Sequence, residues 1–377
     1  MRKFEQTITS ASEVVRTDIE YIQSSLRLEL DQLAGSKILI TGGAGFLGYY
    51  LVQSLLDYNR RADKKDFINV VVYDNYVRGV PQWLINLKKN PQLKLVNYDI
   101  TDPLSAITDH FSYIIHAASI ASPTYYRKYP LQTMDANVKG LRNLLEYALR
   151  QKEEGRPLKS FLFFSTSEIY GDPGSSHIPT PETYRGNVSC TGPRACYDES
   201  KRYGETLCVT FAQEFNIPVT IARPFNNYGP GLKITDRRVI PDFMRDVLQD
   251  KNIKLFSDGS PSRTFCYITD AIIGYFKILV NGKAGEPYNI GLSEPEITIK
   301  DLAEKTISVG QSLLDYSGKL EFATSSDPGY LVDNPNRRCP DITKAQEQLG
   351  YKPTVDLEEG LYRNLLWYKE NQEAIEA

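Results

Sequence analysis

The chain has 377 residues and 41% hydrophobic content, enough to bury a large core as one large domain or two fused domains. Its 44 basic and 47 acidic residues are interspersed and sum to a net charge of −3, which argues against a nucleic-acid or membrane partner. Three dispersed histidines predict no metal site, and five cysteines without a Cys-x-x-Cys pair favour reduced thiols in a cytoplasmic protein. No apolar run approaches the ~18 residues that a membrane helix needs.

Residues 1–34 are predicted to form an N-terminal helical extension. Val15, Ile19, Ile22, Leu26 and Leu33 recur at helical spacing, as on one face of an amphipathic helix. We favour a helix that covers its own domain over an element dedicated to binding a partner.

A dinucleotide-binding turn follows. A short apolar strand at 37–41 runs into a glycine-rich turn and then into a helix with apolar periodicity. Gly42, Gly45 and Gly48 permit a tight turn, close approach of a pyrophosphate, and close packing of the helix on the strand. The free amides at the start of the helix favour phosphate.

The second strand, at 69–73, ends at Asp74 and Asn75. A carboxylate at this place accepts hydrogen bonds from the adenosine ribose and repels a 2′-phosphate. Asp74 therefore predicts NAD rather than NADP as the cofactor.

Strands alternate with helices through residue 225, which predicts an α/β fold with a Rossmann-type, doubly wound parallel sheet. The NAD-binding domain is expected over 35–225, and a smaller C-terminal α/β substrate-binding domain over 226–377, with a return to the sheet edge near 263–292. Strands are predicted at 37–41, 69–73, 93–97, 112–116, 160–165 and 218–222. His116, at the end of one strand, is expected to be buried and structural.

Two helices are predicted at 130–150 and 199–215, and both carry apolar residues at helical spacing. They are more apolar than one domain face requires. We therefore expect a homodimer that packs through these helices.

The reactive groups are predicted from an apolar strand and the helix after it. Thr166 follows the strand at 160–165, and Tyr197 and Lys201 lie one helical turn apart on one helix face. An ammonium beside a phenol favours the phenolate, which can take the proton of a substrate alcohol near neutral pH. Tyr197 is the only one of the 25 tyrosines with a lysine four residues later.

These motifs resemble those of the extended short-chain dehydrogenases/reductases that act on nucleotide sugars, over about residues 36–365. The turn at 42–48, Asp74-Asn75, the run at 165–172 and the segment at 223–230 are shared with that family generally. Three segments, at 118–123, 192–202 and 337–342, together with Arg238-Val-Ile, resemble the UDP-glucuronate decarboxylase branch more than the epimerase or dehydratase branches.

The resemblance implies roles for matching residues. It implies Thr166, Glu168, Tyr197 and Lys201 as the catalytic set. Cofactor contacts would be Gly42, Gly45, Phe46, Leu47, Asp74, Asn75, Asp99, Ile100, Ala117, Tyr197, Lys201 and Pro224. Substrate contacts would be Tyr126, Ser167, Asn226, Arg238 and Arg263, with the last at the diphosphate or at the acid end of the sugar.

The reaction implied is an NAD-dependent decarboxylation of UDP-glucuronate to UDP-xylose through a 4-keto intermediate, with recycled NAD. Ser167 stands where a 4,6-dehydratase has an aspartate, which counts against dehydration. A 4-epimerase or a 4,6-dehydratase that uses the same 4-keto chemistry remains the alternative. A non-catalytic NAD-sensing scaffold is disfavoured because the Thr/Tyr/Lys set is complete. Arg237, near the sugar site, replaces a usual glycine, so the sugar or base could differ.

Overall fold

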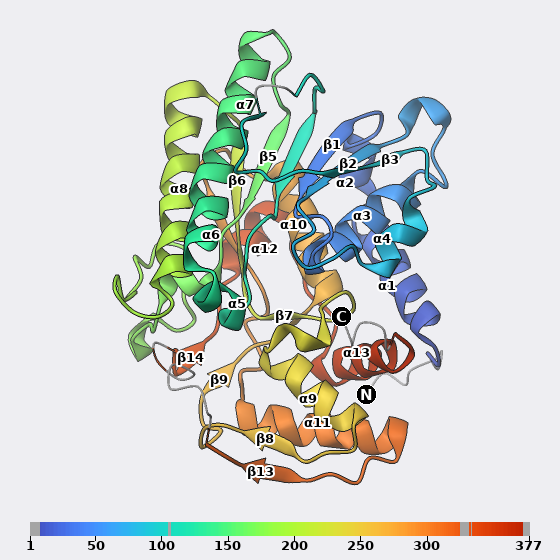
Figure 1. The fold of residues 1–377 in the computed structure, drawn as a ribbon, viewed down its shortest axis with the longest axis vertical. Helices are drawn as coiled ribbons and strands as arrows, with labels where there is room; N and C mark the ends of the chain where they lie inside the picture. Colours follow the sequence, from blue (N-terminus) through green and yellow to red (C-terminus); the bar gives the residue numbers. More distant parts are fainter. Residues whose placement is uncertain (1–7, 105–106, 325–331, 333, 372–377) are drawn as a thin grey trace.

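The computed structural model describes residues 8–104, 107–324, 332 and 334–371, and its centre is a seven-stranded sheet (Figure 1). The strand order is β11-β6-β5-β4-β1-β2-β3, and every neighbouring pair is parallel. The strands are β1 (Lys37–Thr41), β2 (Asn69–Asp74), β3 (Leu93–Asn97), β4 (Tyr113–His116), β5 (Ser160–Phe164), β6 (Val219–Pro224) and β11 (Pro287–Ile290). The predicted doubly wound parallel sheet is confirmed.

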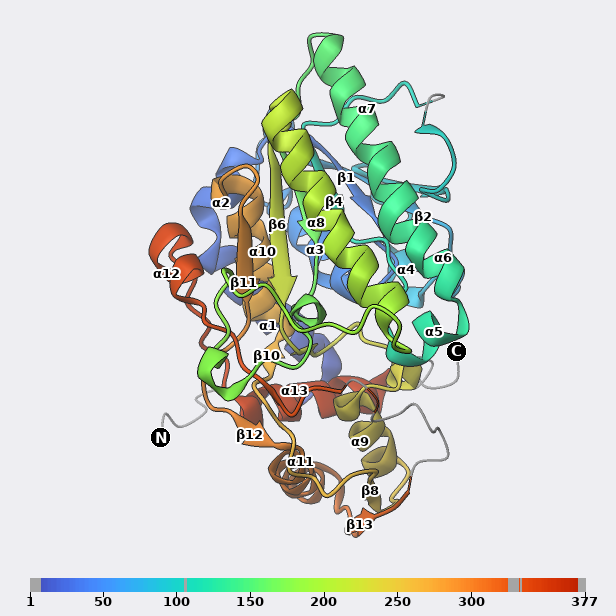
Figure 2. The same cartoon turned by 90° about the vertical axis from the view of Figure 1, so that its left-hand side faces the viewer.

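Helices cover both faces of this sheet, because its strands bury side chains on both sides. In β1, Ile38 and Ile40 join the core cluster on the face of α3 (Phe46–Tyr58) and α10 (Ile268–Asn281). Leu39 points to the opposite cluster, under α7 (Leu141–Glu153) and α8 (Ala195–Phe215). Figure 2 shows α7 and α8 in front of the strands, with α3 and α10 on the other side.

The region predicted as one helix at 130–150 is divided in three. It contains α6 (Pro130–Asp135), a π-helical segment (Ala136–Gly140) and α7. At Gly140 the backbone lies so close to Ile100 that a Cβ would fall 2.5 Å from its Cδ1. This close approach accompanies the widened turn. The helix predicted at 199–215 begins four residues earlier, so Tyr197 lies in the first turn of α8.

The N-terminal helices α1 (Ala11–Ser25) and α2 (Arg27–Gln32) pack on α3, α10 and α13 (Leu357–Glu370). Asp18 of α1 is fully buried and accepts hydrogen bonds from Tyr50, Tyr267 and Arg363. Burial raises the pKa of Asp18 to about 6, against the opposing effect of Arg363. Through Asp18 the N-terminal extension is therefore hydrogen-bonded to residues from the N-terminal and the C-terminal halves of the same chain.

After β6 the chain builds a smaller α/β layer below the sheet, and β11 then pairs with β6 at the sheet edge (Figure 1). Its longer helices are α9 (Val239–Leu248), α11 (Ile299–Leu314) and α13. The remaining short α-helices are α4 (Gln82–Leu87), α5 (Pro123–Lys128) and α12 (Thr343–Leu349), and the short strands are β7 (Asn227–Tyr228), β8 (Ile253–Leu255), β9 (Ser262–Arg263), β10 (Cys266–Tyr267), β12 (Ile297–Thr298), β13 (Leu320–Phe322) and β14 (Arg337–Arg338). In the part of the chain that the structure describes, no helix is long and apolar enough to cross a membrane.

Candidate active site

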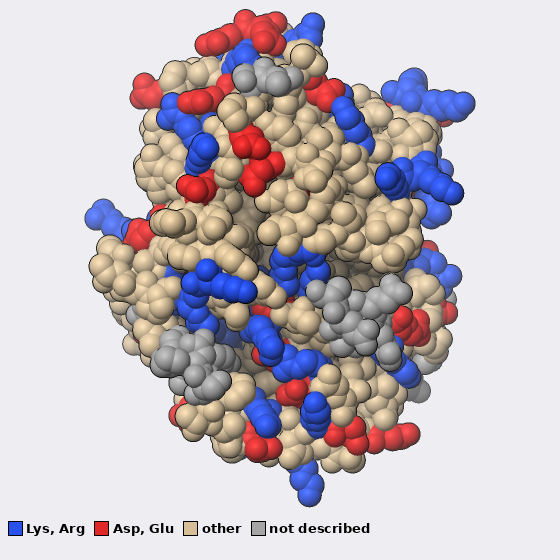
Figure 3. Space-filling model, in the orientation of Figure 1, with Lys and Arg blue, Asp and Glu red and all other residues tan. Residues whose placement is uncertain are grey.

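One cavity of about 2340 Å³ lies between the carboxyl ends of the central strands and the smaller layer. Figure 3 shows lysine and arginine side chains gathered around the hollow in the middle of this face. Every residue that the sequence assigned to the site lines this cavity: Gly42, Gly45, Phe46, Leu47, Asp74, Asn75, Asp99, Ile100, Ala117, Tyr126, Thr166, Ser167, Glu168, Tyr197, Lys201, Pro224, Asn226, Arg238 and Arg263. The structure thus brings together groups that lie more than 200 residues apart.

The glycine turn fits a dinucleotide phosphate. Gly42 has φ +71°, a left-handed conformation, and a Cβ there would fall 2.6 Å from the Cα of Ala118. A Cβ on Gly48 would overlap the backbone of Gly43, so the start of α3 packs directly on the turn. Gly45 precedes α3 and has no side chain to cap it. The first amides of α3 therefore face the cavity without a side-chain acceptor from that position, as a pyrophosphate site needs.

Asp74, which is predicted to bind the ribose, lies beside the glycine turn and lines the cavity. Its Oδ2 accepts from the amide of Ala44 (3.0 Å) and its Oδ1 from the amide of Tyr76 (2.8 Å). Burial raises the pKa of Asp74, and these two amides oppose that rise. Each carboxylate oxygen has capacity for a further hydrogen bond, so Asp74 can also accept from ribose hydroxyls.

Tyr197 and Lys201 project from α8 toward the end of β5. Tyr197 stacks on Tyr126, with ring centroids 5.0 Å apart and planes 9° apart. The ammonium of Lys201 donates to the carbonyl of Phe164 (2.7 Å) and lies 5.9 Å from the ring centroid of Tyr197. Thr166 caps the short helical turn Ser167–Tyr170 by accepting from the amide of Glu168 (3.2 Å).

Burial dominates the acid–base properties of this pair. It raises the pKa of Tyr197 to about 12, although a hydrogen bond from Thr166 and the charge of Arg238 act in the opposite direction. It lowers the pKa of Lys201 to about 7. The sequence-based expectation that the ammonium makes Tyr197 a phenolate near neutral pH is therefore wrong for the protein alone. Both side chains are removed from water, which disfavours both charged forms.

Glu168 is held by two arginines that the sequence analysis did not single out. Arg338 donates from both terminal nitrogens to its two carboxylate oxygens (2.5 Å each), and Arg194 contacts Oε2. Burial alone would raise the pKa of Glu168, but Arg194 and Arg338 outweigh it and lower the pKa to about 2. Glu168 is thus a fixed carboxylate with no proton to donate near neutral pH.

A second carboxyl, Asp198, lies 3.5 Å from Arg194. Burial, then repulsion by Glu168, raises the pKa of Asp198 to about 7. Burial, then repulsion by Arg338, lowers the pKa of Arg263 to about 9, which still leaves it charged near neutral pH. Three guanidinium groups therefore face one firmly ionised carboxylate and one that is partly protonated. Among these five groups the guanidinium charges exceed the carboxylate charges.

Two predicted substrate residues have their polar atoms engaged within the protein. Arg263 donates to the carbonyls of Ser262 and Asn336 (2.7 and 3.0 Å). Asn226, with φ +40°, donates to the carbonyl of Thr264 (2.9 Å). Both line the cavity, and their contacts with a diphosphate remain predictions.

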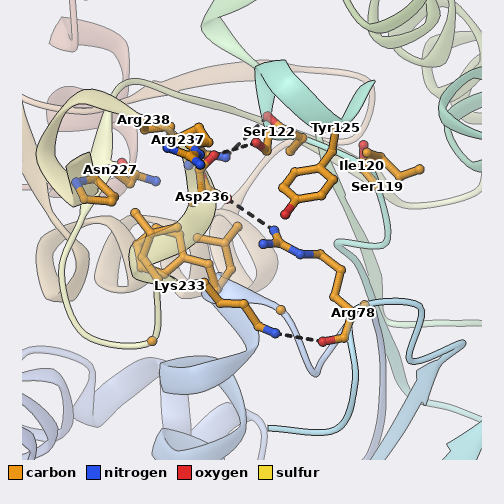
Figure 4. A pocket seen from close by; sticks show the side chains of 18 of the residues that line it. Arg78, Ser119, Ile120, Ser122, Tyr125, Asn227, Lys233, Asp236, Arg237 and Arg238 are labelled. Atoms are coloured by element: carbon orange, nitrogen blue, oxygen red, sulfur yellow. Dashed lines mark hydrogen bonds and ion pairs between the residues drawn. The ribbon is translucent and has the colours of Figure 1, made fainter. Parts of the chain in front are cut away.

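Arg238, the third residue predicted to contact the substrate through a polar head group, is more accessible, with a side chain that is 33% exposed. Its Nε is 3.0 Å from Oδ1 of Asp236, and it donates to the carbonyl of Ala121 (3.3 Å). Figure 4 shows Arg238 beside Arg237 and Asp236, opposite Ser122 and Tyr125. Arg237 takes φ +68°, the left-handed conformation for which glycine is favoured.

His116 is buried and hydrogen-bonded to Thr41 (2.8 Å), and burial followed by repulsion from Lys201 lowers its pKa to about 3. It is neutral near pH 7, as expected for a structural residue. In the described part of the chain, no cluster of three or more His, Cys, Asp or Glu side chains could hold a metal ion.

The parallel sheet, the glycine turn at the start of α3 and the Tyr197–Lys201 pair define an enzyme of the extended short-chain dehydrogenase/reductase class. The sequence matches the NAD dependent epimerase/dehydratase family over residues 38–291. The chain belongs to that family, and NAD is its cofactor.

Relatives agree with this assignment. UDP-glucuronic acid decarboxylase 1 of Arabidopsis thaliana is 38% identical over 327 residues, which cover 87% of this chain and 68% of that protein. UDP-glucuronic acid decarboxylase 1 of Xenopus tropicalis is 33% identical over 378 residues, which cover 99% of this chain and 83% of that protein. The dTDP-glucose 4,6-dehydratase of Streptomyces venezuelae, solved with NAD bound, superimposes with a TM-score of 0.75 at 26% identity, covering 89% of this chain and 98% of that one.

Proposed function

We propose that this protein is an NAD-dependent decarboxylase that converts UDP-glucuronate to UDP-xylose through a 4-keto intermediate. The names of the relatives at 33–38% identity support this proposal. The observation that carries it is the excess of positive charge beside Tyr197, where Arg194, Arg263 and Arg338 surround Glu168.

A glucuronyl carboxylate supplies the negative charge that this cluster lacks. Charge-assisted hydrogen bonds between guanidinium and carboxylate are among the stronger contacts in proteins. A neutral hexose would leave the positive charge uncompensated. The site is therefore better suited to a uronic acid than to the neutral sugars that a dehydratase or a hexose epimerase accepts.

The adjacent residues also disfavour dehydration. Ser167 occupies the place of the dehydratase aspartate, and the low pKa of Glu168 leaves it without a proton to give to a departing hydroxyl. Neither side chain can serve as the acid that dehydration needs.

The residues around the glycine turn are those that would hold NAD: Gly42, Gly45 and the start of α3 at the phosphates, and Asp74 at the ribose. A nicotinamide held there would supply the two-electron oxidant for the C4 alcohol of the sugar and the matching reductant at the end of the cycle. Thr166 and Tyr197 would hold the 4-hydroxyl, and Tyr197, once the positive charge of the bound cofactor has favoured its phenolate form, would receive the proton of that hydroxyl.

The remaining steps are chemistry of the substrate, which the protein steadies. The C5 carboxylate is β to the new C4 ketone, so when the bond to CO₂ breaks its electron pair moves into an enolate at C4. The Tyr197 hydroxyl would stabilise that oxygen, and C5 would take a proton that comes from solvent. Return of the hydride to C4, with the proton of Tyr197 to the C4 oxygen, would then give the alcohol. The product has lost the carboxylate, and with it the attraction of the arginines.

The decisive experiment supplies UDP-glucuronate without added reductant. We expect CO₂, a UDP-pentose and no net accumulation of NADH. Substrate labelled at the carboxyl should lose its label, and product made in D₂O should gain one deuteron at C5. If the label stays on a C4-inverted uronic acid, the protein is an epimerase instead; a 4-keto-6-deoxy product from a nucleotide hexose would identify a dehydratase.

We also propose a homodimer, and a division into an N-terminal extension (1–34), an NAD-binding domain (35–225) and a nucleotide-sugar domain (226–377). Supporting the dimer, α6 and α8 pack against each other, and each exposes a large apolar or aromatic side chain, Leu131 on α6 (67%) and Tyr203 on α8 (51%). Five free thiols fit a cytoplasmic location.

A further inference from the structure

The loop at 75–81 follows the ribose-binding end of β2 and reaches across the cavity. Within the loop, turn hydrogen bonds join Tyr76 to Asp74 and Gly79 to Tyr76 (2.8 Å each). Val77 is 74% exposed, so this part of the loop has little packing of its own. The contacts of Arg78 tie the loop to the opposite wall.

Arg78 makes contacts with both walls. Its guanidinium lies over the ring of Tyr125 (4.4 Å), on its own side of the cavity, and 3.4 Å from Oδ2 of Asp236 on the other. Its carbonyl accepts a hydrogen bond from Lys233 (2.7 Å). Figure 4 shows this arrangement, with Arg78 extended between Tyr125 and Asp236. We call Arg78, Tyr125, Lys233 and Asp236 the cleft clasp.

Two further contacts fix the far side of the cleft clasp. Ser122 donates to the carbonyl of Asp236 (2.7 Å), and Arg238 pairs with its carboxylate. The side chain of Asp236 is only 4% exposed, while that of Arg78 is 35% exposed. The Arg78–Asp236 pair is thus anchored at its buried end and accessible at the other, which is the arrangement of a contact that can open.

We propose that the cleft clasp retains NAD in the protein between turnovers. This inference rests on the NAD site and the nucleotide-sugar site proposed above. Asp74 immediately precedes the loop that contains Arg78, and Asp236 lines the same cavity. A cofactor bound along Asp74 and the glycine turn leaves past this loop, and for that the contacts of Arg78 with Asp236 and Lys233 must break.

Retention suits the reaction, because each cycle regenerates NAD⁺ and needs no exchange with solvent. The nucleotide sugar must exchange at every turnover. The clasp joins Arg78, on the adenosine side of the cavity, to Asp236, which also pairs with Arg238. Arg238 can still exchange its hydrogen bond to the Ala121 carbonyl for one to a diphosphate.

The test measures release of radiolabelled NAD⁺ from loaded protein after a chase with excess unlabelled NAD⁺, without any nucleotide sugar. Removing one partner of an ion pair across an interface acts mainly on the dissociation rate. We expect Arg78→Met and Asp236→Asn each to release NAD⁺ about tenfold faster than wild type. The double variant should release NAD⁺ at about the rate of the single variants, because both changes break the same Arg78–Asp236 pair.

Lys305→Met is the matched control. It removes an ammonium that pairs with Glu358 (2.5 Å) outside this cavity, and release should stay at the wild-type rate. Wild-type release from Arg78→Met overturns the proposal. Fast release from Arg78→Met with wild-type release from Asp236→Asn also overturns it, since Arg78 would then bind NAD directly. Because no sugar is present, these outcomes are independent of whether UDP-glucuronate is decarboxylated.

Discussion

Lys201 should lower the stability of this protein at neutral pH, and Lys201→Met should remove that effect. The pKa of Lys201 falls from 10.5 to about 7 because the side chain is buried. The unfolded chain therefore binds the proton more tightly than the folded protein. Between pH 7 and 10.5 the unfolded state holds more protons, so stability rises with pH across this window and is lost as pH falls.

The size of the effect follows from linkage. One unit of pKa corresponds to about 1.4 kcal/mol, so the penalty from Lys201 is about 1 kcal/mol at pH 9.5 and about 4 kcal/mol at pH 7. The unfolding free energy of the wild type should therefore fall by about 3 kcal/mol more than that of Lys201→Met between these pH values. Methionine keeps the apolar stem but leaves the Phe164 carbonyl without its donor, which costs about 1–3 kcal/mol at every pH.

The assay is urea unfolding of NAD-free protein at several pH values from 7 to 9.5. The difference between wild type and variant cancels the titration of other groups. Lys305→Met, which removes a lysine of α11 from outside the cavity, should follow the wild-type pH dependence. Parallel pH profiles for wild type and Lys201→Met would refute the reasoning, because Lys201 would then be charged in the folded protein at no cost.

Three further outcomes are expected. Tyr197→Phe should keep the fold and NAD binding while turnover falls by roughly 10²–10⁴; near-normal turnover in a steady-state assay would contradict the proposed proton transfer. Asp74→Ala should narrow the preference for NAD⁺ over NADP⁺, measured as the ratio of their dissociation constants, because a charge that repels the 2′-phosphate is gone. Leu131→Glu combined with Tyr203→Glu should convert a dimer to a monomer in light scattering at micromolar concentration, whereas a monomeric wild type would disprove the proposed interface.

The features predicted from the sequence are those that local patterns encode. Parallel strands buried on both faces read as short apolar runs, so six strands of the central sheet were placed within one or two residues. The glycine turn and the spacing of Tyr197 and Lys201 are local as well. The seventh strand, β11, comes after a long irregular region, so only the approximate segment of its return to the sheet edge, near 263–292, could be predicted.

The partners of Glu168 were not predicted because they depend on tertiary folding. Arg338 lies 170 residues away in the sequence, and Arg194 is one arginine among many on the cavity side. Both fall inside segments that carry the family resemblance, which was the available signal. The burial of Tyr197 and Lys201 also depends on tertiary folding. The direction of their pKa shifts, which burial determines, therefore could not be predicted from their four-residue spacing.

Those shifts bear on how the reaction is controlled. At pH 7 the protein alone holds Tyr197 as a phenol and Lys201 as a mixture of charged and neutral forms, so neither is poised as a strong base. Tyr197 is buried, and in such surroundings a nearby positive charge lowers a phenol pKa strongly. The oxidised nicotinamide carries such a charge and the reduced one does not. With NAD⁺ bound, Tyr197 would therefore ionise more readily and could take the proton of the C4 alcohol. It would keep that proton while the cofactor is reduced, and would give it up when hydride return to C4 forms the alkoxide and restores the positive nicotinamide. Burial thus has two effects: it lowers the stability of the folded protein through Lys201, and it makes the pKa of Tyr197 sensitive to the oxidation state of the bound cofactor.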